Sequence, residues 1–172
     1  LWKINTVILN FFESKKIDIL IVACNTSSAL FLDEIKKYSN VPVFELIQPT
    51  AEKIKIDKFK KVTVFGTTRT IDSHCYKTSI QLLAPNTTVQ EIACPLWVPF
   101  IENASSMTTD DISIYADMSK KVLRAINWET EGIIYGCSHY PFLNHHLEKI
   151  WTYNASKHPV KWINPAQTLA SL

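Results

Sequence analysis

The sequence predicts an α/β fold in two halves that face each other, each built on a largely parallel sheet. Apolar runs of β-forming residues alternate with amphipathic stretches along the chain, the pattern of strand–helix–strand units. Two of these runs, IDILIVAC (17–24) and EGIIYGC (131–137), deliver a cysteine to the point where a helical pattern begins. With 172 residues, 47% of them apolar, the chain is long enough to bury a core.

The predicted elements follow from this alternation. We expect strands at six runs of aliphatic and β-branched residues: 17–23, 41–46, 61–65, 88–92, 131–136 and 159–163. We expect helices at the amphipathic stretches around them: 2–14, 27–38, 50–56, 70–83, 95–103, 110–128 and 140–151. The helix over 110–128 is the best defined, because Asp110 and Asp111 suit a helix start and apolar residues recur on one face.

Two prolines mark the predicted domain boundaries. Pro49 follows the run VPVFELIQ and Pro165 follows VKWIN, so both stand where the chain could pass from one lobe to the other. We therefore assign residues 1–48 together with 164–172 to a first lobe, and residues 49–163 to a second.

Composition argues against several classes of function. The formal net charge is +2 with no basic cluster, so we expect no nucleic-acid partner. No run of about 18 uncharged apolar residues could span a bilayer. The three glycines form neither a dinucleotide fingerprint nor a phosphate-binding loop. None of the four cysteines lies in a C-x-x-C pair or at metal-ligand spacing from a histidine, so we expect no metal, and Cys75 and Cys94 are interpreted as small packed residues.

The two cysteines at the strand ends, Cys24 and Cys137, are the candidates for chemistry. Ligands of open α/β sheets bind at the carboxyl ends of the strands. The amides of a helix start favour thiolate over thiol and attract anions. Two such thiols suggest a pair of catalytic bases.

Four segments, in order, carry a resemblance to a known family. They are ACNTSSA (23–29), FGTTRTI (65–71), CPLWVPFIE (94–102) and GCSHYPFL (136–143). Together they resemble the glutamate racemase family of cofactor-independent amino-acid racemases. The resemblance covers essentially the whole chain but lacks the family's N-terminal segment with its aspartate-bearing glycine-rich motif, and also its later Pro-Tyr-Gly segment. It therefore implies two facing α/β lobes of which the first is incomplete, and it puts in doubt the activity of the chain alone.

The resemblance also implies a mechanism and a set of site residues. Cys24 would act on D-glutamate and Cys137 on L-glutamate from opposite sides of the α-carbon, with no pyridoxal phosphate and no metal, and His139 would assist Cys137. The residues implied to bind substrate are Asn25, Thr26, Thr67, Thr70, Ser138, His139 and Glu102. For the hydroxyl and amide side chains, helix capping is the alternative interpretation.

Two other functions stay open at this point. An aspartate racemase is the closest alternative enzyme, but such relatives typically carry an acidic residue where this chain has His139. A catalytically silent binding module is the alternative from another class. A glutamate racemase would serve peptidoglycan synthesis in the cytoplasm, a reducing compartment that suits free thiols. Because an incomplete first sheet would expose an apolar edge, we also expect the chain to associate with itself.

Overall fold

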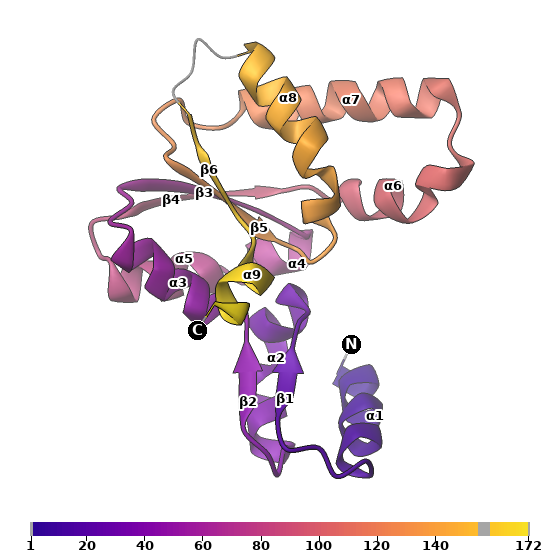
Figure 1. Cartoon of the computed structure of the whole chain (residues 1–172), viewed down its shortest axis with the longest axis vertical. Helices are drawn as coiled ribbons and strands as arrows, with labels where there is room; N and C mark the ends of the chain where they lie inside the picture. The colour runs from indigo at the N-terminus through magenta and orange to yellow at the C-terminus, as the bar shows by residue number, and fades with distance from the viewer. Residues whose placement is uncertain (1, 155–158, 172) are drawn as a thin grey trace.

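The computed structural model describes residues 2–154 and 159–171 and contains two parallel sheets. One sheet has the two strands β1 and β2, and the other has four strands in the order β4-β3-β5-β6. Figure 1 shows the small sheet with α1 and α2 as a separate lobe beside the larger, helix-covered sheet. The predicted fold class, α/β with parallel sheets in two lobes, is confirmed.

The first lobe is small because its strands are short. Its elements are α1 (Trp2–Glu13), β1 (Leu20–Val22), α2 (Asn25–Tyr38) and β2 (Val43–Glu45). Leu20 pairs with Val43 and Val22 with Glu45 in parallel register. Alternation along β1 buries Leu20 and Val22 against Leu9 and Ile35. The opposite face of the sheet therefore keeps its apolar side chains exposed.

The second lobe carries the larger sheet. The elements that follow β2 along the chain are α3 (Ile47–Ile56), β3 (Lys61–Gly66), α4 (Thr68–Asp72), α5 (Cys75–Leu83), β4 (Thr88–Ala93), α6 (Trp97–Asn103), the 3₁₀ turn η1 (Ala104–Ser106), α7 (Thr109–Arg124), β5 (Gly132–Gly136), the 3₁₀ turn η2 (Tyr140–Leu143), α8 (Asn144–Asn154), β6 (Lys161–Ile163) and α9 (Pro165–Ala170). All three strand pairings are parallel.

Helices cover both faces of the four-stranded sheet (Figure 1). On one face, Val64 and Ile134 pack with α3, α4 and α5. On the other, Ile133 and Tyr135 pack with α6, α7 and α8. The central strands β3 and β5 are buried on both sides, which explains why their sequences are mostly apolar, although β3 includes the buried polar residue Thr63.

The six predicted strands are all present, although β1, β2 and β6 are shorter than the runs 17–23, 41–46 and 159–163. Two helices differ from the prediction in ways that the local contacts explain. The helix expected over 70–83 is two helices, because His74 adopts a left-handed conformation with φ 53° between them. The helix expected over 50–56 begins earlier, at Ile47, because the Glu45 carboxylate accepts hydrogen bonds from the first backbone amides of α3, at 2.6 and 2.7 Å. Pro49 therefore lies within α3.

The C-terminal helix α9 was not among the predicted elements. Asn164 caps it by accepting a hydrogen bond from the Ala166 amide at 3.0 Å, and Pro165 occupies its first position. α9 packs against α3 and β5 of the second lobe, and Ala166, Leu169 and Ala170 also line a hollow beside the exposed face of the small sheet. The assignment of residues 164–172 to the first lobe, and the boundaries at 48 and 163, stay predictions.

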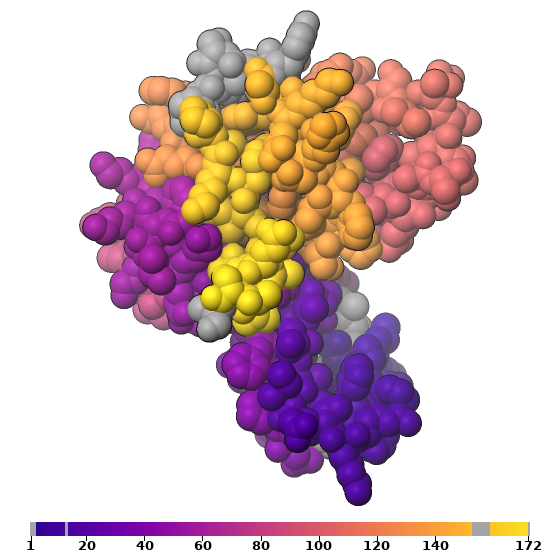
Figure 2. All heavy atoms as spheres, in the orientation of Figure 1, coloured from indigo at the N-terminus to yellow at the C-terminus, as the bar shows by residue number. Residues whose placement is uncertain are grey.

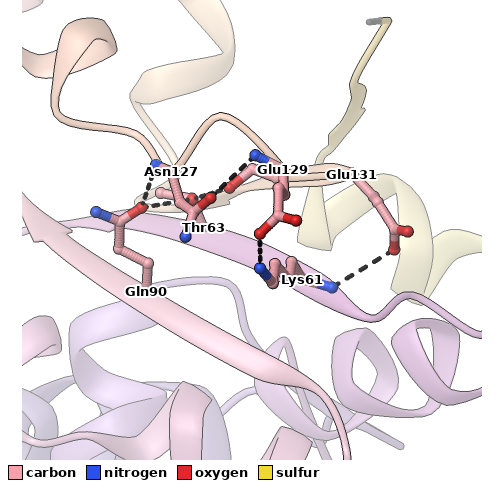
Figure 3. Close-up of polar contacts among 7 residues, drawn as sticks. Lys61, Thr63, Gln90, Asn127, Glu129 and Glu131 are labelled. Atoms are coloured by element: carbon pink, nitrogen blue, oxygen red, sulfur yellow. Dashed lines mark hydrogen bonds and ion pairs between the residues drawn. The ribbon is translucent and has the colours of Figure 1, made fainter.

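A network of polar side chains lies at the amino-terminal ends of the strands of the large sheet (Figure 3). The buried Thr63 hydroxyl lies 3.2 Å from Gln90 Oε1 and 2.9 Å from the Thr130 hydroxyl. Lys61 pairs with Glu129, and its backbone amide donates to Glu131 at 3.4 Å (Figure 3). Glu131 also accepts a hydrogen bond from the backbone of Lys60 at 2.6 Å. These contacts connect the start of β3 to the loop before β5, at the ends of the strands opposite the two cysteines.

The first lobe exposes apolar side chains on two of its surfaces. On α1, Ile4, Val7, Ile8 and Phe11 recur at helical spacing and are exposed. The uncovered face of the small sheet adds Ile19, Ile21 and Phe44. Figure 2 shows this lobe projecting from the rest of the molecule. None of the helices in 2–154 or 159–171 is long and apolar enough to cross a membrane.

Candidate active site

Cys24 lies at the carboxyl end of β1, at the residue before α2. Its backbone is extended, with φ −97° and ψ 116°, and the first backbone bond of the helix runs from the Ser28 amide to the Cys24 carbonyl. The thiol is exposed. The strand–cysteine–helix arrangement expected from IDILIVAC is therefore present, with α2 beginning directly at Asn25.

Cys137 lies at the corresponding end of β5 but in different surroundings. It is buried, with 7% of its surface exposed, and follows Gly136 on a strand covered on both faces. A Cβ at Gly136 would stand 2.7 Å from the Phe65 carbonyl oxygen, so only glycine allows β3 and β5 to approach this closely. The chain after Cys137 forms the 3₁₀ turn η2 before α8, and not an α-helix directly.

The pKa of the Cys137 thiol is raised, chiefly by burial. Hydrogen bonds from the backbone of His139 and Tyr140 act in the opposite direction, and negative charge on Cys24 raises the pKa further. The expected help from local amides is thus present but is outweighed by desolvation. The influence of Cys24 shows that the two sulfurs, from separate sheets, lie close enough for one charge to act on the other.

His139 links Cys137 to Glu102. Its Nδ1 lies 3.9 Å from the Cys137 sulfur, and its Nε2 lies 3.1 Å from Glu102 Oε1. The side chains of His139 and Glu102 are both partly exposed to solvent, so their ion pair contributes only modestly to stability. The geometry places Glu102 on the histidine. An imidazole that contacts a thiol on one side and a carboxylate on the other is arranged to accept the thiol proton.

Three threonine hydroxyls meet where the two lobes touch. Thr26 Oγ1, from α2, lies 3.1 Å from Thr67 Oγ1 and 3.0 Å from Thr70 Oγ1. Thr67 and Thr70 lie 3.0 Å from each other, and the Thr67 hydroxyl also caps α4. Each hydroxyl can donate or accept, so the triangle can turn its donors toward an anion. The capping interpretation thus holds for Thr67 at the same time as this cross-lobe contact.

Asn25 is a second point of contact between the lobes. It is buried, and its Oδ1 accepts a hydrogen bond from the Tyr76 hydroxyl at 2.5 Å. Its Nδ2 is buried without a hydrogen-bond partner among the described residues. A buried, unpaired amide is costly and would be stabilised by an acceptor from a ligand or water.

The remaining candidates differ in placement. Ser138 is exposed beside Cys137. Cys94 is buried and half-buried Cys75 begins α5, and burial raises the pKa of both thiols, which fits their interpretation as packed residues. In the part of the chain that the structure describes, no group of three His, Cys, Asp or Glu side chains could hold a metal ion.

Two residues near the thiols had not been singled out from the sequence. Tyr76 contacts Asn25 from α5, and the buried Glu45 caps α3. An apolar helical pattern that includes Tyr76 predicts burial but cannot reveal the partner of its hydroxyl. A carboxylate two residues before a helix is a recognisable capping signal, and it could have located the start of α3.

Comparison with known proteins identifies the family. The profile of the Asp/Glu/hydantoin racemase family matches residues 5–172. The chain belongs to this family. Among curated relatives of this racemase-family chain, a glutamate racemase of Prochlorococcus marinus is 36% identical over 169 residues, which are 98% of this chain and 59% of the relative. A glutamate racemase of Streptococcus suis is 34% identical over 137 residues, or 79% of this chain and 50% of the relative.

A solved structure agrees with these relatives. The glutamate racemase of Francisella tularensis in complex with D-glutamate superposes with a TM-score of 0.79 at 26% identity, over 97% of this chain and 62% of that one. The racemase-family chain spans about half the length of the first curated relatives that it matches.

Proposed function

We propose that the chain is a glutamate racemase that works by proton transfer between two cysteines and without a cofactor. For L-glutamate, the Cys137 thiolate removes the α-proton and the Cys24 thiol delivers a proton to the opposite face, which gives D-glutamate. Cys137 is then a thiol and Cys24 a thiolate, and proton exchange with solvent restores the starting state. The reverse reaction exchanges the two roles.

The observation that carries this proposal is the electrostatic contact between Cys24 and Cys137. They follow strands of two different sheets, yet the charge of one acts on the pKa of the other. This influence supports the proposal, because a two-base mechanism requires two thiols that can approach one carbon from opposite sides. The glutamate racemases found among the relatives support glutamate as the substrate, and the Francisella enzyme is named with D-glutamate bound.

His139 and Glu102 support the Cys137 side of the reaction. Because burial raises the pKa of Cys137, its thiol needs a nearby base to lose its proton near neutrality. His139 Nδ1 is positioned for this transfer, and Glu102 stabilises the imidazolium that results. We assign Glu102 to this positioning role in addition to the substrate contact predicted for it.

The carboxylates of glutamate would bind at the junction between the lobes. The donors available there are the three threonine hydroxyls, Asn25 Nδ2, Ser138 and the free amides at the start of α2. We further propose that the D-glutamate formed serves bacterial cell-wall peptidoglycan synthesis in the cytoplasm, a role consistent with the named relatives.

The test is α-proton exchange of each glutamate enantiomer in heavy water, measured separately by NMR or mass spectrometry. Exchange from both enantiomers, with interconversion, is the expected result. Exchange from L-glutamate alone would leave only the Cys137 side functional and would contradict the two-base cycle. Exchange from neither would favour the silent binding module and overturn the proposal.

A further inference from the structure

Tyr76 contacts a residue next to each of the two cysteines, Cys24 and Cys137. It is the second residue of α5 and is fully buried. Its ring lies against the end of β5, since a Cβ at Gly136 would stand 3.3 Å from Tyr76 Cε2, one residue before Cys137. Its hydroxyl donates to Asn25 Oδ1 at 2.5 Å, one residue after Cys24. A single rigid side chain therefore connects the ends of two strands that belong to different sheets.

The surroundings keep this connection in place over the whole working pH range. Burial raises the pKa of Tyr76 well above its ordinary value, so the phenol stays a neutral donor. The residue before α5 in this turn, His74, has a left-handed backbone that ends α4 and sets a new direction for α5. Its Nδ1 contacts Glu91 Oε2 on β4 at 2.7 Å, which anchors that turn to the sheet.

We propose that Tyr76 is a positioning residue that fixes Cys24 and the start of α2 relative to Cys137 and the end of β5. It does so by joining Asn25 to the end of β5. This role rests on the proposed racemase function for its catalytic consequence. A displacement of about 1 Å between reacting groups can cost about a hundredfold in rate, so a hydroxyl that locks two thiols across a junction affects the chemical step. Tyr76 itself does not touch the reacting atoms.

The test replaces Tyr76 with phenylalanine, which keeps the ring against Gly136 and removes only the hydroxyl. We expect kcat for glutamate racemisation to fall about tenfold while KM stays within about twofold, because the change affects alignment more than binding. In an Asn25→Ala background the same substitution should cause no further loss of kcat, since the partner that follows Cys24 is already absent and the other partner of the hydroxyl, Thr50, lies on α3. Independent, additive losses would overturn the inference.

Tyr135→Phe is the matched control. Tyr135 is also buried, and its hydroxyl donates to an asparagine, Asn144 Oδ1, at 2.6 Å. This bond lies within the second lobe, on the face of the sheet that α8 covers. The control loses the same type of bond, so it should lose similar stability but keep kcat within about twofold. Equal kcat values for the two variants would show that Tyr76 only contributes to packing.

A second measurement does not depend on turnover. Amide hydrogen exchange in the first turn of α2 should become at least about threefold faster in Tyr76→Phe than in Tyr135→Phe, because that turn loses its tie to the second lobe. If the unmodified chain racemises neither enantiomer, the proposed function fails and this measurement alone decides the inference. Should Tyr76→Phe not fold, Asn25→Ala breaks the same bond from the other side. Unchanged exchange in the variant that folds would overturn the inference.

Discussion

The units around Cys24 and Cys137 share a sequence pattern but differ in their support. Cys24 follows a three-residue strand of a two-stranded sheet and is exposed. Cys137 follows a five-residue strand that is buried on both faces. Cys137 has His139 and Glu102 beside it, whereas within residues 2–154 and 159–171 we find no imidazole or carboxylate bonded to Cys24.

The comparison shows that the end of a strand determines where each cysteine lies. The neighbouring elements determine which groups can assist its thiol. At Cys137 the η2 turn and α6 bring a histidine and a glutamate together. After Cys24 come Asn25 and Thr26, whose amide and hydroxyl groups can bind and orient but do not titrate near neutrality. We therefore expect the two directions of the reaction to respond differently to substitutions.

The largest expected effect comes from Cys137→Ser. Exchange of L-glutamate in heavy water should fall by at least about a thousandfold, because serine is similar in size but is not a comparable base. The fold should be retained, as checked by thermal unfolding. Cys75→Ser removes a thiol at the start of α5 and serves as the control, with exchange expected within about twofold. Retained exchange in Cys137→Ser would contradict the role of this thiol.

Next, His139→Asn should reduce L-glutamate exchange by about a hundredfold and D-glutamate exchange much less. The reason is that His139 lies 3.9 Å from the Cys137 sulfur, whereas among the described residues no hydrogen bond joins it to Cys24. His145→Asn, an exposed position on α8, is the control. Equal losses for the two enantiomers would show that the histidine serves both units and would remove the asymmetry.

The pH dependence of L-glutamate exchange should show the raised pKa of Cys137 directly. Because burial favours the thiol, the thiolate fraction at neutral pH is small and grows with pH up to the raised pKa. We expect the rate to increase by as much as about tenfold per pH unit above pH 7 and to continue past the ordinary thiol value of about 8.5. A plateau below that value, in initial rates at constant ionic strength, would be inconsistent with the buried thiol as base.

A smaller effect is expected for Glu102→Gln. The pair with His139 spans 3.1 Å but both side chains are partly exposed, so its contribution to the imidazolium is modest. L-glutamate exchange should fall about fivefold at low salt, and the loss should shrink as salt is added. Glu34→Gln, on the exposed surface of α2, should change neither rate. A loss that does not respond to salt would show that Glu102 acts by something other than its ion pair with His139.

The smallest effect on activity is expected at the opposite edge of the large sheet. Thr63→Val removes the buried hydroxyl shared by Gln90 and Thr130, so the free energy of unfolding should fall by about 1–2 kcal/mol. Exchange of both glutamate enantiomers should stay within about twofold, because these contacts stabilise the sheet at the ends of its strands opposite the two cysteines. Thr88→Val, exposed at the start of β4, is the stability control. Loss of α-proton exchange in a Thr63→Val variant that remains fully folded would show that the two ends of the sheet are coupled.

Strand positions could be predicted from sequence because burial on both faces of β3 and β5 leaves short, predominantly apolar runs. The break between α4 and α5 could not, because a left-handed residue at His74 leaves the apolar periodicity intact on both sides. For α9 the signals were available, since Asn164 and Pro165 form a helix start, but they were interpreted as a crossing between lobes.

The candidate site was only partly accessible from sequence. The motifs placed Cys24, Cys137 and the threonines, and the structure brings these side chains to one junction. The pairing of His139 with Glu102 and of Tyr76 with Asn25 joins residues far apart in the chain, so no local pattern could indicate it. The raised pKa of Cys137 depends on burial by elements that follow β4, and it likewise required the fold.

Gly66 and Gly136 pair in register at the carboxyl ends of β3 and β5. A Cβ on Gly66 would meet Ile71 at 2.9 Å, and one on Gly136 would meet the Phe65 carbonyl oxygen at 2.7 Å. Even a single added methyl group at either glycine would have to move a neighbour. Ile71 is a side chain that can turn away, whereas the Phe65 carbonyl is part of the backbone, so for protein engineering Gly136 is the residue of this pair to leave unchanged.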